Sequence, residues 1–162
     1  MRTITPNLWF DGTAEEAAVF YTGLFPDSRI VRRLPSPADN PLSAKGAFLA
    51  VEFTLKGQPF LGINGGSQFP FTQAVSFAIE CDDQAEVDRY WDALTANGGE
   101  ALPCGWCRDR FGLVWQVVPR RLMELLYGDD VAAGERAAKA LYGMRKIDVA
   151  ALEAAAAHPG PG

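Results

Sequence analysis

The chain has 162 residues, of which 48% are hydrophobic and 22% are charged, and this composition is typical of one globular domain with a substantial buried core. Fifteen Lys and Arg against twenty Asp and Glu give a net charge of −5, which argues against nucleic acid and anionic membranes as partners. No apolar run approaches the roughly 20 residues that a membrane helix needs, and the first residues lack the apolar stretch of a signal peptide. Three cysteines do not suit a disulfide framework, so we expect a cytoplasmic protein.

The first half of the chain predicts a strand, a helix and three more strands, in order over residues 3–10, 13–25, 28–34, 47–55 and 58–64. Thr13 and Glu16 have the spacing of a capping box at the start of the helix, and Pro26 ends it. Lys56 and Gly57 predict a tight turn between the last two strands.

The second half repeats the pattern, with strands expected over residues 74–81, 100–104 and 111–118. Asp83 is expected to cap the helix that follows the first of these strands, and two glycines end that helix. After Pro119 the composition favours three short helices, the last of which is capped by Asp148.

The two halves match at a nearly constant offset. Five positions of the first predicted helix recur 70 residues later, pairing Thr13, Glu16, Phe20, Tyr21 and Leu24 with Asp83, Glu86, Tyr90, Trp91 and Leu94. A cap, an apolar stripe and a strand that repeat together indicate a duplication. We therefore expect an α+β fold of two tandem β-α-β-β-β modules with curved mixed sheets. The chain is expected to form a single domain over residues 1–162, with modules at about 1–66 and 72–119 and a helical extension at about 120–157.

Five short motifs carry a resemblance to a known family: LWFDG at 8–12, NGG at 64–66, CGW at 104–106, DRFG at 109–112 and WQ at 115–116. With the duplicated module, they resemble the vicinal oxygen chelate superfamily of glyoxalase I, bleomycin-resistance proteins and extradiol dioxygenases. They are most similar to its PhnB-like branch, which is labelled 3-demethylubiquinone-9 3-methyltransferase. That label implies S-adenosylmethionine, but the sequence lacks the early glycine-rich turn and the parallel-sheet pattern that normally hold this molecule. We expect no cofactor.

The superfamily resemblance also implies where metal ligands would lie, on the first and last strands of each module. The positions are Thr5 and Ala74 for histidine, and Gln116 and either Gly62 or Asn64 for glutamate. None of these is an imidazole or a carboxylate, and the single histidine, His158, lies in the C-terminal tail. We expect no metal site, and therefore no basis for glyoxalase or dioxygenase activity.

Strand parity predicts which side chains line a ligand-binding cup. If Leu8 and Phe10 pack under the first helix, Trp9 faces the cup, and Gln116 faces it from the second module. The candidate binding residues are Trp9, Phe48, Asn64, Trp106 and Gln116. For Trp9 and Phe48, a place in the ordinary apolar core stays an alternative.

Two functions stay open at this point. In the first, the aromatic candidates line an apolar cup that sequesters a hydrophobic or aromatic molecule without metal. In the second, Glu52 or Cys104 is the catalytic group of a metal-independent enzyme of unknown reaction. Glu52 stands on an otherwise apolar strand, where burial would raise its pKa and an edge position would leave it solvated. Cys104 lies near two arginines, which favour a thiolate, but no helix follows its C-x-x-C spacing with Cys107, so we expect free thiols.

The resemblance to the PhnB-like branch further implies a homodimer. Strand 58–64 is expected to leave an edge that a partner covers. The predicted C-terminal helices carry two apolar stripes, made of Leu122, Leu125 and Leu126 and of Leu141, Met144 and Ile147. These stripes suit a partner surface or packing within the same chain. The expected interface buries more than roughly 1,500 Å² in total.

Overall fold

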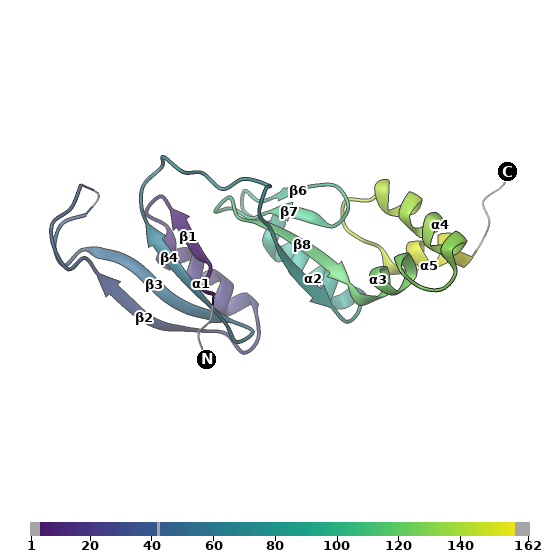
Figure 1. Ribbon diagram of the computed structural model, residues 1–162, viewed down its shortest axis with the longest axis horizontal. Helices are drawn as coiled ribbons and strands as arrows, with labels where there is room; N and C mark the ends of the chain where they lie inside the picture. The colour runs from purple at the N-terminus through teal and green to yellow at the C-terminus, as the bar shows by residue number, and fades with distance from the viewer. Residues whose placement is uncertain (1–3, 42, 158–162) are drawn as a thin grey trace. The chain divides into compact units, whose positions relative to one another are not determined.

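The computed structural model describes residues 4–41 and 43–157, so the tail with His158 lies outside the described residues. The chain forms two compact units, residues 1–71 and 72–162 (Figure 1). Each unit contains one β-α-β-β-β module with a four-stranded mixed sheet, and three helices follow the second module. The predicted α+β fold with a duplicated module is confirmed. Among the described residues, no helix is long and apolar enough to span a membrane.

The first unit consists of β1 (Asn7–Phe10), α1 (Ala14–Leu24), β2 (Arg29–Pro35), β3 (Phe48–Leu55) and β4 (Gln58–Asn64). Its sheet has the order β1-β4-β3-β2, in which β1 and β4 are parallel and the other neighbours are antiparallel. The strand β4 therefore lies inside the sheet, so our expectation that residues 58–64 leave an edge for a partner is wrong.

The core of the first unit lies between its sheet and α1. Tyr21 of α1 is buried and stacks on Phe53 of β3, which stacks in turn on Phe60 of β4. A Cβ atom at Gly62 would lie 3.2 Å from a methyl carbon of Val51 and 3.4 Å from the Cβ of Ala14 in α1, so glycine allows the helix and the sheet to pack closely here. The predicted turn at Lys56 is present, with a φ of 47° followed by a glycine at 82°.

The start of α1 differs from the prediction. Thr13 makes no side-chain capping hydrogen bond, so the expected cap from its hydroxyl is wrong. The side chain of Asn64, at the end of β4, takes this role: its Oδ1 accepts a hydrogen bond of 2.9 Å from the backbone N–H of Ala14. One of the N–H groups that a helix leaves unsatisfied at its start is thereby satisfied from the sheet.

The second unit begins with β5 (Phe77–Cys81), α2 (Gln84–Thr95), β6 (Glu100–Ala101), β7 (Trp106–Arg108) and β8 (Val114–Pro119), in sheet order β5-β8-β7-β6. Asp83 caps α2 as predicted, because its Oδ1 accepts from the backbone N–H of Glu86 at 2.9 Å. The strands are shorter than expected. The three-residue strand β7 lies between the predicted strands 100–104 and 111–118, where the sequence predicts none.

A buried carboxylate organises the hairpin between β7 and β8. Asp109 is only 2% exposed, and its Oδ1 accepts backbone hydrogen bonds from Phe111 at 2.8 Å and Leu113 at 3.1 Å. Its Oδ2 accepts a hydrogen bond of 2.8 Å from the indole of Trp115. The motifs at 109–112 and 115–116 thus fix the fold of this hairpin.

The C-terminal extension (residues 120–157) contains α3 (Arg120–Leu126), α4 (Val131–Tyr142) and α5 (Val149–Ala157). Asp148 caps α5 as predicted, accepting from the N–H of Ala151 at 2.9 Å. Four residues of the extension form a buried cluster, Leu122, Leu141, Ile147 and Leu152, against which Leu125, Leu126 and Met144 pack. Of the two alternatives for the apolar stripes, packing within the same chain is therefore the one observed.

Candidate functional site

One face of the second sheet presents polar and aromatic side chains. Helix α2 packs against β5, β7 and β8, and the alternate residues Ile79, Cys107 and Trp115 are buried. The strand register places Trp106 beside Gln116, and Gln116 beside Ala78. Because side chains alternate along a strand, this row lies on the face opposite the buried residues. Trp106 and Gln116, two of the predicted binding residues, are thus direct neighbours.

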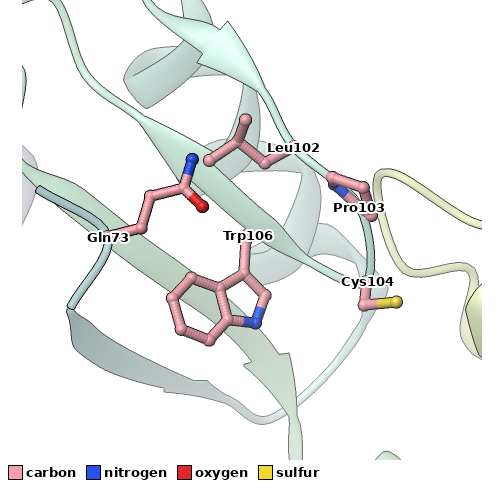
Figure 2. A pocket seen from close by; sticks show the side chains of 5 residues that line it. All are labelled: Gln73, Leu102, Pro103, Cys104 and Trp106. Atoms are coloured by element: carbon pink, nitrogen blue, oxygen red, sulfur yellow. The ribbon is translucent and has the colours of Figure 1, made fainter. Parts of the chain in front are cut away.

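A pocket of about 310 Å³ opens at Trp106 and is lined by Gln73, Leu102, Pro103, Cys104 and Trp106. Figure 2 shows the indole of Trp106, the side chain of Leu102 and the amide of Gln73 around one space. The lining residues include no Asp, Glu, Lys, Arg or His. Next to Trp106, Gln116 donates a hydrogen bond of 2.9 Å from its Nε2 to the hydroxyl of Ser76, so a pair of uncharged polar groups lies on the same face.

The thiol of Cys104 points away from this pocket (Figure 2). The thiol donates a hydrogen bond to the backbone carbonyl of Leu141, near the end of α4, with an Sγ–O distance of 3.6 Å. The two arginines expected to favour its thiolate have other partners. Arg108 pairs with Glu100 at 2.6 Å, and Arg110 lies over the ring of Phe111. The side chain of Cys104 therefore belongs to the apolar cluster of the extension.

Cys107 is fully buried on the other face of the sheet. Burial, and to a lesser degree the nearby carboxylate of Asp109, raises the pKa of its thiol to about 12. None of Cys81, Cys104 and Cys107 forms a disulfide.

In the first unit, the side chain of Trp9 contacts residues 65–69, which include part of the motif at 64–66. Its indole Nε1 donates a hydrogen bond of 2.8 Å to the carbonyl of Gly66, and its ring meets Phe69 edge-on at 5.3 Å. A Cβ atom at Gly65 would lie 2.0 Å from the ring, so only glycine fits there. Trp9 is half-buried, and these contacts explain the motifs at 8–12 and 64–66 as structural ones.

Glu52 forms a two-pronged ion pair with Arg32 of the neighbouring strand, with bonds of 2.7 and 3.0 Å. The hydrogen bond from Arg32 holds the pKa of the Glu52 carboxyl below its ordinary value, and partial desolvation opposes this effect more weakly. The expectation that burial raises the pKa of Glu52, as in a general base, is therefore wrong, because Arg32 compensates the negative charge of its carboxylate.

The remaining predicted residues also have defined places. Phe48 is half-buried at the start of β3, and Asn64 lies on the helix-facing side of β4, where it caps α1. The equivalent of Gln116 in the first module is Ile63, because Gln116 pairs with Ala78 as Ile63 pairs with Trp9. The expected position at Gly62 or Asn64 was wrong by one residue.

Within residues 4–41 and 43–157, no group of three or more His, Cys, Asp or Glu could hold a metal ion.

Sequence reasoning missed three of the residues that line the pocket. Leu102 and Pro103 directly precede the Cys-Gly-Trp motif, so their nearness to Trp106 along the chain was an available signal. Gln73 lies 33 positions before Trp106, ahead of β5, and nothing in its local sequence distinguishes it.

Comparisons with known proteins agree with this architecture. A family model described as 3-demethylubiquinone-9 3-methyltransferase matches residues 2–118, which is most of the chain and ends just before α3. A putative 3-demethylubiquinone-9 3-methyltransferase (PhnB protein) from Bacillus cereus is 33% identical with a TM-score of 0.65, and the match covers 73% of this chain and 99% of that one. Both findings confirm the resemblance that the motifs indicate.

More distant solved structures share the fold. A protein from Pseudomonas aeruginosa is 22% identical with a TM-score of 0.60, covering 74% of this chain and 98% of that one. The fosfomycin resistance protein FosX from Listeria monocytogenes is 16% identical with a TM-score of 0.50, covering 74% and 93%. None of the curated proteins matches this chain.

Proposed function

We propose that this chain, which belongs to the 3-demethylubiquinone-9 3-methyltransferase family, binds a small molecule on Trp106 without a metal ion. The family lies in the PhnB-like branch of the vicinal oxygen chelate superfamily. The proposed ligand is uncharged and largely apolar. The observation that carries this proposal is the pocket at Trp106, which combines an indole with Leu102, Pro103 and the amide of Gln73. Aromatic and aliphatic walls with a few polar groups are typical of small-molecule sites. A volume of about 310 Å³ is at the lower end of such sites and favours a compact ligand.

The alternative, a metal-independent enzyme, has less support. Its two candidate catalytic groups are Glu52, whose charge is compensated by Arg32, and Cys104, whose thiol turns toward Leu141. Neither group presents a free acid, base or nucleophile to the pocket at Trp106. The predicted binding residues Trp106 and Gln116 lie side by side, and this juxtaposition favours binding over catalysis.

The methyltransferase description of the family suggests S-adenosylmethionine, which carries a sulfonium, an ammonium and a carboxylate. The side chains that line the pocket at Trp106 include no charged group that would pair with any of these. The pocket fits that molecule poorly, and we derive no methyl transfer from it. The name of FosX concerns resistance to fosfomycin, an anionic phosphonate, for which the same uncharged lining offers no counterion.

The proposal is tested with the neutral fluorescent probe N-phenyl-1-naphthylamine, whose emission rises in apolar surroundings. We expect saturable binding, and the Trp106→Ala variant should weaken it at least tenfold, because the contact of two aromatic systems and the buried area contribute about 2 kcal/mol. Dialysis against EDTA should leave the affinity unchanged, since the superfamily's ligand positions hold Thr5, Ala74 and Gln116. Binding that disappears with EDTA and returns with a divalent metal would overturn the metal-free site.

A matched control is Tyr142→Ala, which removes an exposed aromatic side chain on α4 instead. It should bind the probe as the unchanged protein does. Equal affinities for Trp106→Ala and the control would contradict the proposal.

We also propose that the two units and the extension act as one functional domain, and that the chain works as a homodimer in the cytoplasm. The support for the dimer is the family resemblance together with an exposed edge strand of the first sheet, β2, considered below.

A further inference from the structure

The segment that joins α4 to α5 (residues 143–148) runs beside the loop that leads into Trp106. The backbone N–H of Cys104 donates to the carbonyl of Met144 at 2.8 Å, and the N–H of Gly105 donates to the carbonyl of Arg145 at 2.7 Å. In Figure 2 this segment passes next to Cys104, on the side away from Trp106. Two consecutive backbone groups of the pocket loop are therefore satisfied by the C-terminal extension.

In the pocket loop, Cys104 adopts a backbone conformation that a residue with a side chain does not favour. Cys104 has a φ of 59° and Gly105 a φ of 81°, so two successive residues occupy the left-handed region. For a residue with a side chain, such as Cys104, that region costs on the order of 1 kcal/mol or more and persists only where the surroundings enforce it. The carbonyls of Met144 and Arg145, which accept hydrogen bonds from the N–H groups of Cys104 and Gly105, are such surroundings.

Gly105 is also enclosed tightly. A Cβ atom there would lie 2.6 Å from the Cδ1 of Ile147 and 2.9 Å from the carbonyl of Val117. On its other side the carbonyl of Gly105 accepts a hydrogen bond of 2.8 Å from the N–H of Val117. The loop is thus held between β8 and Ile147, which is 1% exposed.

The linker itself is anchored by α2. The amide of Gln84 donates to the carbonyl of Ile147 at 3.1 Å and accepts from the N–H of Val149 at 2.9 Å. Lys146 forms an ion pair of 2.8 Å with Asp88, one turn further along α2. A continuous set of contacts therefore runs from Gln84 through Ile147 to Gly105, and ends at Trp106.

We propose that the C-terminal extension is a positioning device for the ligand site, in which Gln84 and Ile147 hold the 103–105 loop and thereby fix the indole of Trp106. The inference rests on the proposed binding function and adds to it. The matched family model ends at residue 118, whereas Met144, Arg145 and Ile147, which contact this loop from the extension, lie beyond it. The extension would then tune which uncharged, flat apolar molecules fit, by setting the position of Trp106 relative to Gln73.

The test uses the full chain labelled with 5-fluorotryptophan, whose four tryptophans give separate fluorine resonances that single Trp→Phe variants assign. The Gln84→Ala variant removes the hydrogen bond to Ile147 in the linker and the one from Val149 at the start of α5. We expect the Trp106 resonance to shift or broaden and the Trp9 resonance, from the first unit, to stay in place. The matched control is Glu153→Gln, which breaks an exposed ion pair of 2.7 Å with Arg121 elsewhere in the extension and should leave both resonances unchanged.

Affinity for N-phenyl-1-naphthylamine should fall three- to tenfold in Gln84→Ala and stay unchanged in Glu153→Gln. If Gln84→Ala does not fold, Lys146→Met, which keeps the aliphatic stem and removes the ion pair, gives the same two measurements. A Trp106 resonance that is unmoved in the folded variant, or that moves without any loss of affinity, overturns the proposal. Failure of the unchanged protein to bind the probe would refute the proposed function instead, and the fluorine spectrum would then decide the positioning role alone.

Discussion

Three polar side chains of the sequence motifs make their hydrogen bonds within the fold. The indole of Trp9 bonds to Gly66, the amide of Asn64 caps α1, and the buried carboxylate of Asp109 accepts from two backbone groups and from Trp115. Buried polar groups are costly unless they are satisfied in this way. These motif residues therefore account for the shared fold more directly than for any shared chemistry.

The three thiols differ in how reactive they should be. At pH 8 iodoacetamide should label Cys104 in the folded protein and leave Cys107 untouched, because the thiolate is the nucleophile and burial raises the pKa of Cys107 to about 12. Cys81 is fully buried and should be protected as well. In denaturant all three should react, and peptide mass spectrometry identifies the modified residue. Labelling of Cys107 as fast as Cys104, or a disulfide between them after mild oxidation, would contradict this assignment.

At the scale of elements, the start of α1 is stabilised from 50 residues away. The Asn64→Ala variant should lower the free energy of unfolding by about 1 kcal/mol, because it leaves the N–H of Ala14 without its acceptor. Thr13→Ala should change it by less than about 0.5 kcal/mol, since Thr13 makes no side-chain capping bond. Urea unfolding followed by circular dichroism measures both.

The conservative variant Asn64→Asp separates capping from packing. It keeps an acceptor oxygen at the helix start and should retain most of the stability. A loss of stability at Thr13→Ala that equals the loss at Asn64→Ala would show that the two residues share the cap.

Local signals explain which elements were predictable. The Lys56-Gly57 turn, the Asp83 cap and the apolar stripe of α2 depend on neighbours within a few residues, and all are present. The cap of α1 was not predictable, because Thr13 has the right local sequence and a residue on β4 competes successfully for the role. The strand β7 has three residues, too few for a period-two pattern to show.

The candidate site was predictable only in part, for the same physical reason. The parity of β8 and the Cys-Gly-Trp motif placed Gln116 and Trp106 among the candidates, and the register makes them neighbours. Strand parity does not reveal that an arginine faces Glu52 across β2 and β3, since the partner depends on the register of two strands. Nor does strand parity reveal that the side chain of Cys104 packs against the apolar cluster of the extension.

At the scale of the whole molecule, the apolar surface available to a partner is smaller than the sequence suggested. The stripes of the extension are used inside the chain, and β4 is interior to its sheet. The strand β2 remains as an edge of seven residues, most of them exposed, with Val31 51% exposed. Two of its three arginines, Arg32 and Arg33, are paired with Glu52 and Glu15. Their charge therefore does little to oppose an approaching strand.

An edge strand on which most of the charges are compensated is suited to pairing with a second copy of the same strand. We therefore expect light scattering at micromolar concentration to give twice the chain mass of 17.6 kDa. Val31→Lys should shift the mass toward that of one chain, because a charge would be placed within the pairing edge. Val19→Lys is the matched control, since Val19 is 53% exposed but lies on α1, and it should remain dimeric. A monomeric mass for the unchanged protein would refute the dimer, and a dimer that survives Val31→Lys would show that the copies associate through a surface other than β2.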